Sequence, residues 1–176
     1  MKQTNILFII VQLFACIGAS AQSNVTFTSS YTNQKDNCLW RSEITGIEPH
    51  DDDYRTCEGI GDYEIFEFYQ TDGIPRQIVQ NTHTDFETYL MPIDVYNSWH
   101  YGTLLEWRLA NGEPFAVIYR ITCYKKSQDG TEKKDEYLIV RGLEGYNIKT
   151  DINVKKTKNA NKLARNTADK AFSIQN

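Results

Sequence analysis

Two strand-like runs, residues 104–109 and 115–124, stand on either side of Asn111 and Gly112. Asn followed by Gly is the strongest short hairpin signal, because both residue types accept the positive φ angles of a tight two-residue turn. Large side chains at alternate positions of the second run share one face of the strand, because strand side chains point to the two faces in turn. The sequence therefore predicts an antiparallel β-hairpin at the centre of the fold.

Further strand signals lie on both sides of this hairpin. Apolar runs at 137–141 and 146–154 extend it to a four-strand antiparallel meander over residues 104–154. A second hairpin is predicted between residues 63–69 and 74–79, which an Asp-Gly turn connects. The chain is therefore expected to be rich in antiparallel sheet.

One helix is predicted, beginning after Asn159, whose side chain can cap it. Its apolar residues recur at steps of three and four, which favours packing on a sheet; a helix lying on a membrane surface fits less well, since the stripe is rich in alanine. The expected fold class is α+β, with a mainly antiparallel sheet, curved or closing into a partial barrel, and a C-terminal helix packed on it. The stripe consists of Ala160, Leu163, Ala164, Ala168, Ala171 and Phe172.

Residues 81–101 are ambiguous, because aromatic and polar side chains alternate there without a clear period. We expect a short helix or a long ordered loop that covers one end of the sheet. Tyr96, Trp99 and Tyr101 are the aromatic residues that we expect at the surface, where they would offer a stacking platform for a glycan or a contact patch for a protein.

The N-terminal residues resemble a cleavable export signal. Residues 1–21 combine an early lysine, an apolar stretch at 6–19 and a small-x-small ending. The apolar stretch is shorter than the ~20 residues that span a bilayer, and no later stretch is long enough. Residues 22–176 are then a single exported domain, periplasmic or secreted. Attachment of a lipid at Cys16 is an alternative.

Three cysteines remain after the signal, and export favours their oxidation. Cys38 and Cys57 flank a polar segment with little apolar content, so a bridge between them would stabilise it. Cys123 lies in an apolar run and is expected to be a buried free thiol. No metal-binding cysteine spacing is present.

Charge is unevenly distributed along a chain whose formal net charge is −4. That balance argues against a nucleic-acid partner, which requires a basic surface. Residues 43–72 are strongly acidic and residues 149–170 are basic. Both segments can be solvated surface; alternatively the acidic one meets a protein partner with a basic surface. Asp51, Asp52 and Asp53 are the candidate contact residues.

Several segments occur together in a recognisable order: residues 30–32 ahead of Cys38, then 57–61, 105–109 with 111–116, and 159–164. In this order they resemble an uncharacterised family of small exported bacterial proteins, mainly proteobacterial. The similarity covers residues 31–172, and the Glu-Trp-Arg segment is its most specific part.

The resemblance supports a disulfide between Cys38 and Cys57, since the family carries both cysteines. A later pair of family cysteines is missing from this chain, so the resemblance implies that packing alone holds the helix. The function of the family is unassigned. The resemblance therefore implies location and fold but no active site.

No catalytic set, metal site or cofactor is predicted from the residues. His50 and its acidic neighbours lack the spacing of a calcium loop, and Ser98 near His100 lacks a nucleophile motif. Glu106 is expected to form a cross-strand ion pair with Arg120. The favoured hypothesis is a non-enzymatic binding or interaction protein of the cell envelope or secreted fraction; a small hydrolase or carbohydrate-active enzyme, and a structural envelope component, are alternatives.

Overall fold

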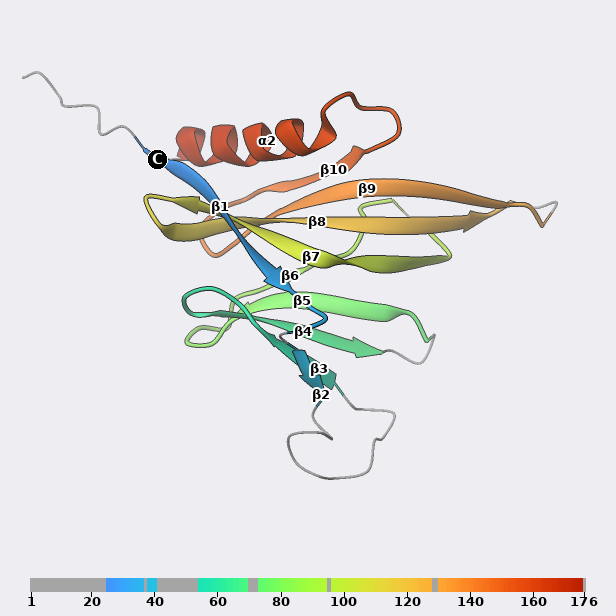
Figure 1. The fold of residues 1–176 in the computed structure, drawn as a ribbon, viewed down its shortest axis with the longest axis horizontal. Helices are drawn as coiled ribbons and strands as arrows, with labels where there is room; N and C mark the ends of the chain where they lie inside the picture. The colour runs from blue at the N-terminus through green and yellow to red at the C-terminus, as the bar shows by residue number, and fades with distance from the viewer. Residues whose placement is uncertain are drawn as a thin grey trace, which may run out of the picture.

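The protein has three layers in a computed structural model that describes residues 25–36, 38–40, 54–69, 73–94, 96–127 and 130–175. A helix covers one face of a five-stranded sheet, here called sheet A, and a second five-stranded sheet, sheet B, packs on the other face (Figure 1). All strand pairs are antiparallel. The predicted α+β class is confirmed, with the strands divided between two sheets rather than placed in one.

Each sheet consists mostly of strands that are consecutive in sequence. Sheet A has the spatial order β1 (Phe27–Asn33), β7 (Ser98–Ala110), β8 (Glu113–Lys126), β9 (Glu132–Gly142) and β10 (Lys149–Asn153). Sheet B has the order β2 (Cys38–Trp40), β3 (Tyr54–Glu58), β4 (Tyr63–Tyr69), β5 (Pro75–Asn81) and β6 (Glu87–Tyr89). Helix α2 spans Ala160–Gln175.

The predicted hairpins and meander are confirmed. Strands β7 to β10 form the meander, and β4 pairs with β5. Asn111 and Gly112 have φ angles of 52° and 94° in the β7–β8 turn, so the Asn-Gly signal identified this turn correctly. Strand β7 begins at Ser98, earlier than expected. Residues 98–101 therefore belong to sheet A and residues 87–89 form strand β6 of sheet B, so the prediction of a helix or loop is wrong for both segments.

Strand β8 is buried on both faces, which explains its continuous apolar run at residues 114–119. Val117, Tyr119 and Ile121 face sheet B, whereas Ala116 and Ile118 face the helix. Successive side chains of a strand point to opposite faces, so one central strand supplies both cores.

Helix α2 lies close to sheet A because its buried residues are small. Ala160, Ala164 and Ala168 are almost fully buried, and the Phe172 ring contacts Phe115 at 4.9 Å between centroids. The chain enters the helix through Asn159, which has a φ angle of 57° and whose carbonyl accepts the Leu163 N–H at 3.0 Å.

Two ion pairs, here called the helix clamp, also hold α2. Arg108 Nη2 lies 2.7 Å from both carboxylate oxygens of Asp169, and Arg165 Nε lies 2.6 Å from Glu106. Glu106 thus pairs with the helix and not with Arg120, which pairs with Glu136. Both earlier expectations, the Glu106–Arg120 pair and a helix held by packing alone, are wrong.

Candidate functional site

The two sheets open into a recess at one end, here called the mouth recess. It has a volume of about 290 Å³, the lower end of the range for a small-molecule site. Sheet B, strand β7 and the turn after β1 all contribute to it. The lining residues are Gln34, Lys35, Arg55, Glu67, Tyr69, Pro75, Gln77, His100, Tyr101, Gly102 and Thr103.

A row of polar residues crosses the inner face of sheet B at this recess. Arg55, Glu67 and Gln77, here called the polar row, are aligned across β3, β4 and β5. The next row, two residues deeper along each strand, is Cys57, Ile65 and Val79, all fully buried. Because strand side chains alternate with a period of two, both rows face sheet A. The inner face therefore changes from apolar to polar at its open end.

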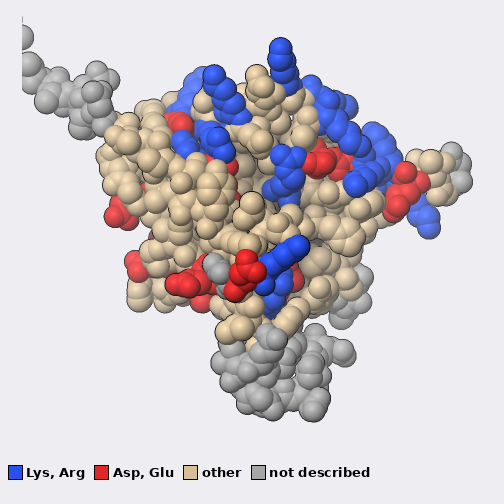
Figure 2. Space-filling model, in the orientation of Figure 1, with Lys and Arg blue, Asp and Glu red and all other residues tan. Residues whose placement is uncertain are grey.

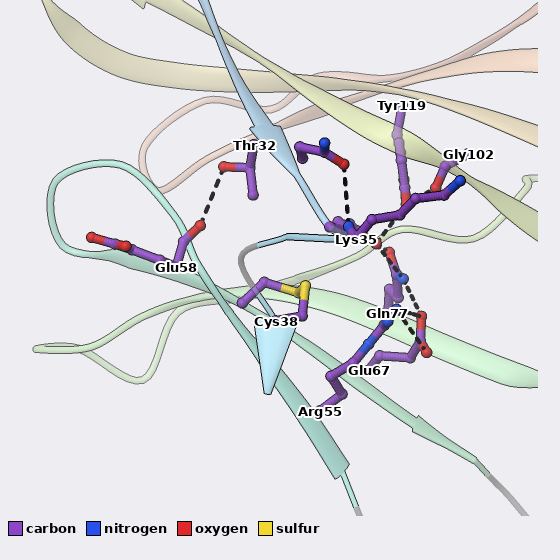
Figure 3. Close-up of a disulfide and its surroundings, with 12 residues drawn as sticks. Thr32, Lys35, Cys38, Arg55, Glu58, Glu67, Gln77, Gly102 and Tyr119 are labelled. Carbon is purple, nitrogen blue, oxygen red and sulfur yellow. Dashed lines mark hydrogen bonds and ion pairs between the residues drawn. A yellow bond between two sulfur atoms is a disulfide. The ribbon is translucent and has the colours of Figure 1, made fainter. Parts of the chain in front are cut away.

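Hydrogen bonds fix the polar row. Gln77 donates through Nε2 to Gln34 Oε1 at 2.9 Å and also to the Glu67 carboxylate (Figure 3). Gln34 donates back to Gln77 Oε1 at 3.2 Å, and Arg55 Nη2 lies 3.1 Å from both Glu67 oxygens. Gln34, Glu67 and Gln77 are 3%, 7% and 1% exposed. Buried polar groups are held firmly when their partners are in place.

Two tyrosines of sheet A complete the network. Tyr119 Oη lies 2.6 Å from Gly102 O and 2.8 Å from Gln34 Oε1 (Figure 3). Tyr101 Oη accepts the Gln77 backbone N–H at 3.2 Å, and its ring stacks on Tyr119. Burial raises the pKa of Tyr101 to about 12 and raises the pKa of Tyr119 well above its ordinary value. Both hydroxyls are therefore neutral hydrogen-bonding groups at ordinary pH.

The predicted disulfide lies beside this network. Cys38 and Cys57 are bonded and face each other across β2 and β3 (Figure 3), so the pairing is confirmed. The bridge fixes the edge strand β2 to β3 next to Arg55. Cys123 is a buried free thiol, as predicted. Burial raises its pKa to about 12, which keeps it protonated and unreactive.

The three aromatic residues predicted at the surface all pack against the core between the sheets. Tyr101 lines the mouth recess. Trp99 is only 5% exposed and lies in the core, under the Arg76 guanidinium at 4.6 Å, so its predicted surface position is wrong. Tyr96 is half-buried and donates to Tyr137 Oη at 2.7 Å. They form no common platform.

Asp51, Asp52 and Asp53 lie outside the described residues, as do the export signal and Cys16. The acidic contact face and the lipid attachment therefore stay predictions. Within the described residues, no group of three or more His, Cys, Asp or Glu side chains is placed to hold a metal ion. No helix in this described part is long and apolar enough to cross a membrane.

The polar row escaped the sequence-based reasoning, although part of its signal was visible. Glu67 stands two residues after Ile65, in phase with the buried side of its strand. A charged residue at an inward position is a sign of a special environment. Gln77 and Gln34 gave no such sign, because their role depends on strand register and on a turn between the two sheets.

The arrangement defines a three-layer α+β protein with a preorganised polar recess between its sheets. Comparison with protein-family models, curated proteins and solved structures finds no match at a significant level. The resemblance to exported bacterial proteins therefore stays a prediction, and the functional argument depends on the residues of this chain.

Proposed function

We propose that this chain is an exported, non-enzymatic binding protein whose mouth recess holds a small polar ligand or the end of a glycan chain. The observation that carries the proposal is the polar row: three inward-facing polar side chains, held by fixed partners, border an open recess. Binding sites use a few such fixed polar groups to orient a ligand. The Cys38–Cys57 disulfide is compatible with export.

Aromatic side chains at the rim support a glycan. Tyr69 is 46% exposed and stacks on Trp40, with 6.3 Å between ring centroids. Arg55 lies over the same Trp40 ring at 5.6 Å. A sugar presents hydroxyls at its edge and C–H groups on its faces, so it suits a recess that combines fixed polar groups with aromatic rings.

The chemistry of the recess favours binding over catalysis. The Glu67 carboxylate is occupied by Arg55 and Gln77, and the Tyr101 and Tyr119 hydroxyls are protonated. In the described residues, no serine, threonine or cysteine side chain is shown hydrogen-bonded to an imidazole, the arrangement that activates such nucleophiles.

A glycan array, followed by titration of the strongest glycan against residues 22–176, tests the proposal. We expect Tyr69→Ala to weaken binding about tenfold and Tyr89→Ala to leave it within about twofold. Tyr89 is 44% exposed, which matches Tyr69, but it lies on β6 outside the mouth recess. Mass spectrometry of the recovered glycan should show it intact. No bound glycan, equal losses in both variants, or cleavage of the glycan would contradict the proposal.

A further inference from the structure

A second hollow, here called the basic hollow, lies on the helix side of sheet A, where the loop after β10 enters α2. Its volume is about 560 Å³. Arg120 of β8 and Lys162 and Arg165 of α2 supply three cations to its wall, and Thr157, Asn159 and Asn161 supply neutral polar groups. No carboxylate belongs to the described residues that line it. The chemistry of the wall therefore suits an anion.

Both arginines are held in place by other side chains of the protein. Arg120 pairs with Glu136 and donates to Asn161 Oδ1 at 3.3 Å. Arg165 donates to Glu106 and, at 3.0 Å, to Tyr31 Oη. These contacts use two or three of the five N–H donors of each guanidinium, so donors remain for an oxyanion. Fixed guanidinium groups recognise phosphate oxygens well, because little side-chain freedom is lost on binding.

Exposed lysines surround the basic hollow. Lys155, Lys156 and Lys158 lie in the loop before α2, and Lys134 lies on β9. Lys155 Nζ donates to Lys134 O at 2.7 Å, which brings the loop against the strand. Figure 2 shows Lys and Arg gathered over the start of α2, β10 and the ends of β8 and β9. The formal net charge of the chain is −4, so this basic surface is a local concentration of positive charge.

We propose that the basic hollow binds the phosphate headgroup of an anionic phospholipid and that the surrounding lysines hold this face against the bilayer. The lysines spread over several elements, more widely than one free phosphate requires, and they match a surface that carries many phosphates. Leu163 and Ile174 are 45% and 73% exposed on α2. Eleven residues is close to three helical turns, so Leu163 and Ile174 lie on the same exposed side of α2.

Vesicle sedimentation with the mature chain tests this proposal. We expect binding to vesicles that contain phosphatidylglycerol, little binding to pure phosphatidylcholine, and release as sodium chloride rises. Lys156→Gln with Lys162→Gln should weaken binding about tenfold.

The matched control is Lys125→Gln with Lys149→Gln. These lysines are exposed and carry the same charge as the lysines they are compared with. Lys125 is in phase with Cys123 on β8, and Lys149 is in phase with Asp151 on β10, so both lie on the face of sheet A that is turned away from the helix. Their removal should change binding by no more than about twofold. Circular dichroism confirms that each variant is folded.

Three results would overturn the proposal. The first is equal binding to both kinds of vesicle, and the second is an equal loss in the control variant. The third is calorimetric binding of inorganic phosphate without any binding to vesicles, which would assign the hollow to a free anion. None of these results depends on the mouth recess, because that recess lies on the other side of sheet A.

Discussion

Both faces of sheet A carry polar contacts to the layer that covers them, but the contacts differ in kind. On the helix side, Arg108 and Arg165 form bidentate ion pairs with Asp169 and Glu106. On the sheet B side, the amides of Gln34 and Gln77 form a reciprocal pair, and Tyr119 hydrogen-bonds to Gln34. The helix clamp joins two elements that pack tightly, whereas the polar network borders an open recess.

Polar groups therefore serve two purposes in this fold, one in the helix clamp and another at the mouth recess. In the helix clamp, each carboxylate is matched by the guanidinium that faces it, and the contact fixes α2 on the sheet. In the mouth recess, Glu67 and Gln77 are hydrogen-bonded to the other residues of the network and also line an open recess. We therefore regard the helix clamp as structural and the mouth recess as the ligand site.

Removal of Arg108 should have the largest effect on stability. Its side chain is 6% exposed, and Arg108→Met leaves Asp169 without its guanidinium partner. The substitution also removes one of the two hydrogen bonds of the Ser29 hydroxyl, which keeps its bond to Glu106. We expect the free energy of unfolding to fall by about 3 kcal/mol, as for other buried ion pairs that lose one partner. Urea denaturation measures this loss. Arg108→Met with Asp169→Leu should recover most of it; a single variant as stable as the wild type would disprove the clamp.

Removal of the disulfide tests the covalent support of the sheet B side. Cys38 and Cys57 are 19 residues apart, and closing a loop of this size stabilises a protein by about 3 kcal/mol. Cys38→Ala with Cys57→Ala should lower the free energy of unfolding by a comparable amount. Cys123→Ala removes a thiol without opening a loop and should cost less. An equal loss in the two proteins would show that lost packing, not the bridge, explains the effect.

The smallest effect is expected at high pH, from Tyr101. Its pKa is raised from 10.0 to about 12 in the folded protein, chiefly by burial. The raised pKa contributes stability that is fully present below the unfolded pKa and is lost as pH rises from the unfolded to the folded value. Tyrosinate absorbance should contain a component near pH 12 that Tyr101→Phe removes. Titration of Tyr101 with the exposed tyrosines would contradict its buried position.

Local signals predicted much of the fold. The turn at Asn111 and Gly112, the alternation in β8 and the alanine stripe of α2 each depend on neighbours in sequence, and all three are confirmed. Leu163, which was expected in the stripe, is 45% exposed and does not belong to it. The Glu106 partner was missed because Arg165 lies 59 residues away, on an element whose orientation the sequence does not give.

The candidate site depends even more on long-range contacts. The polar row exists only because the register of three strands aligns Arg55, Glu67 and Gln77. Trp99 was expected at the surface because it lies in the stretch 81–101, whose pattern fits neither a strand nor a helix clearly. Its burial follows from the early start of β7, which pairs Trp99 with buried Cys123 on the sheet B side of sheet A.

The central claim is that the mouth recess is the ligand site. Its most direct test compares the affinities of the Gln77→Leu and Arg108→Met variants for the glycan that binds most strongly on the array, under conditions in which both variants are folded. Gln77→Leu breaks the network beside the mouth recess, whereas Arg108→Met removes contacts on the helix side of sheet A alone. We predict affinity about tenfold weaker than wild type for Gln77→Leu and within about twofold of it for Arg108→Met. Equal affinities of the two variants would contradict the assignment of the mouth recess as the ligand site.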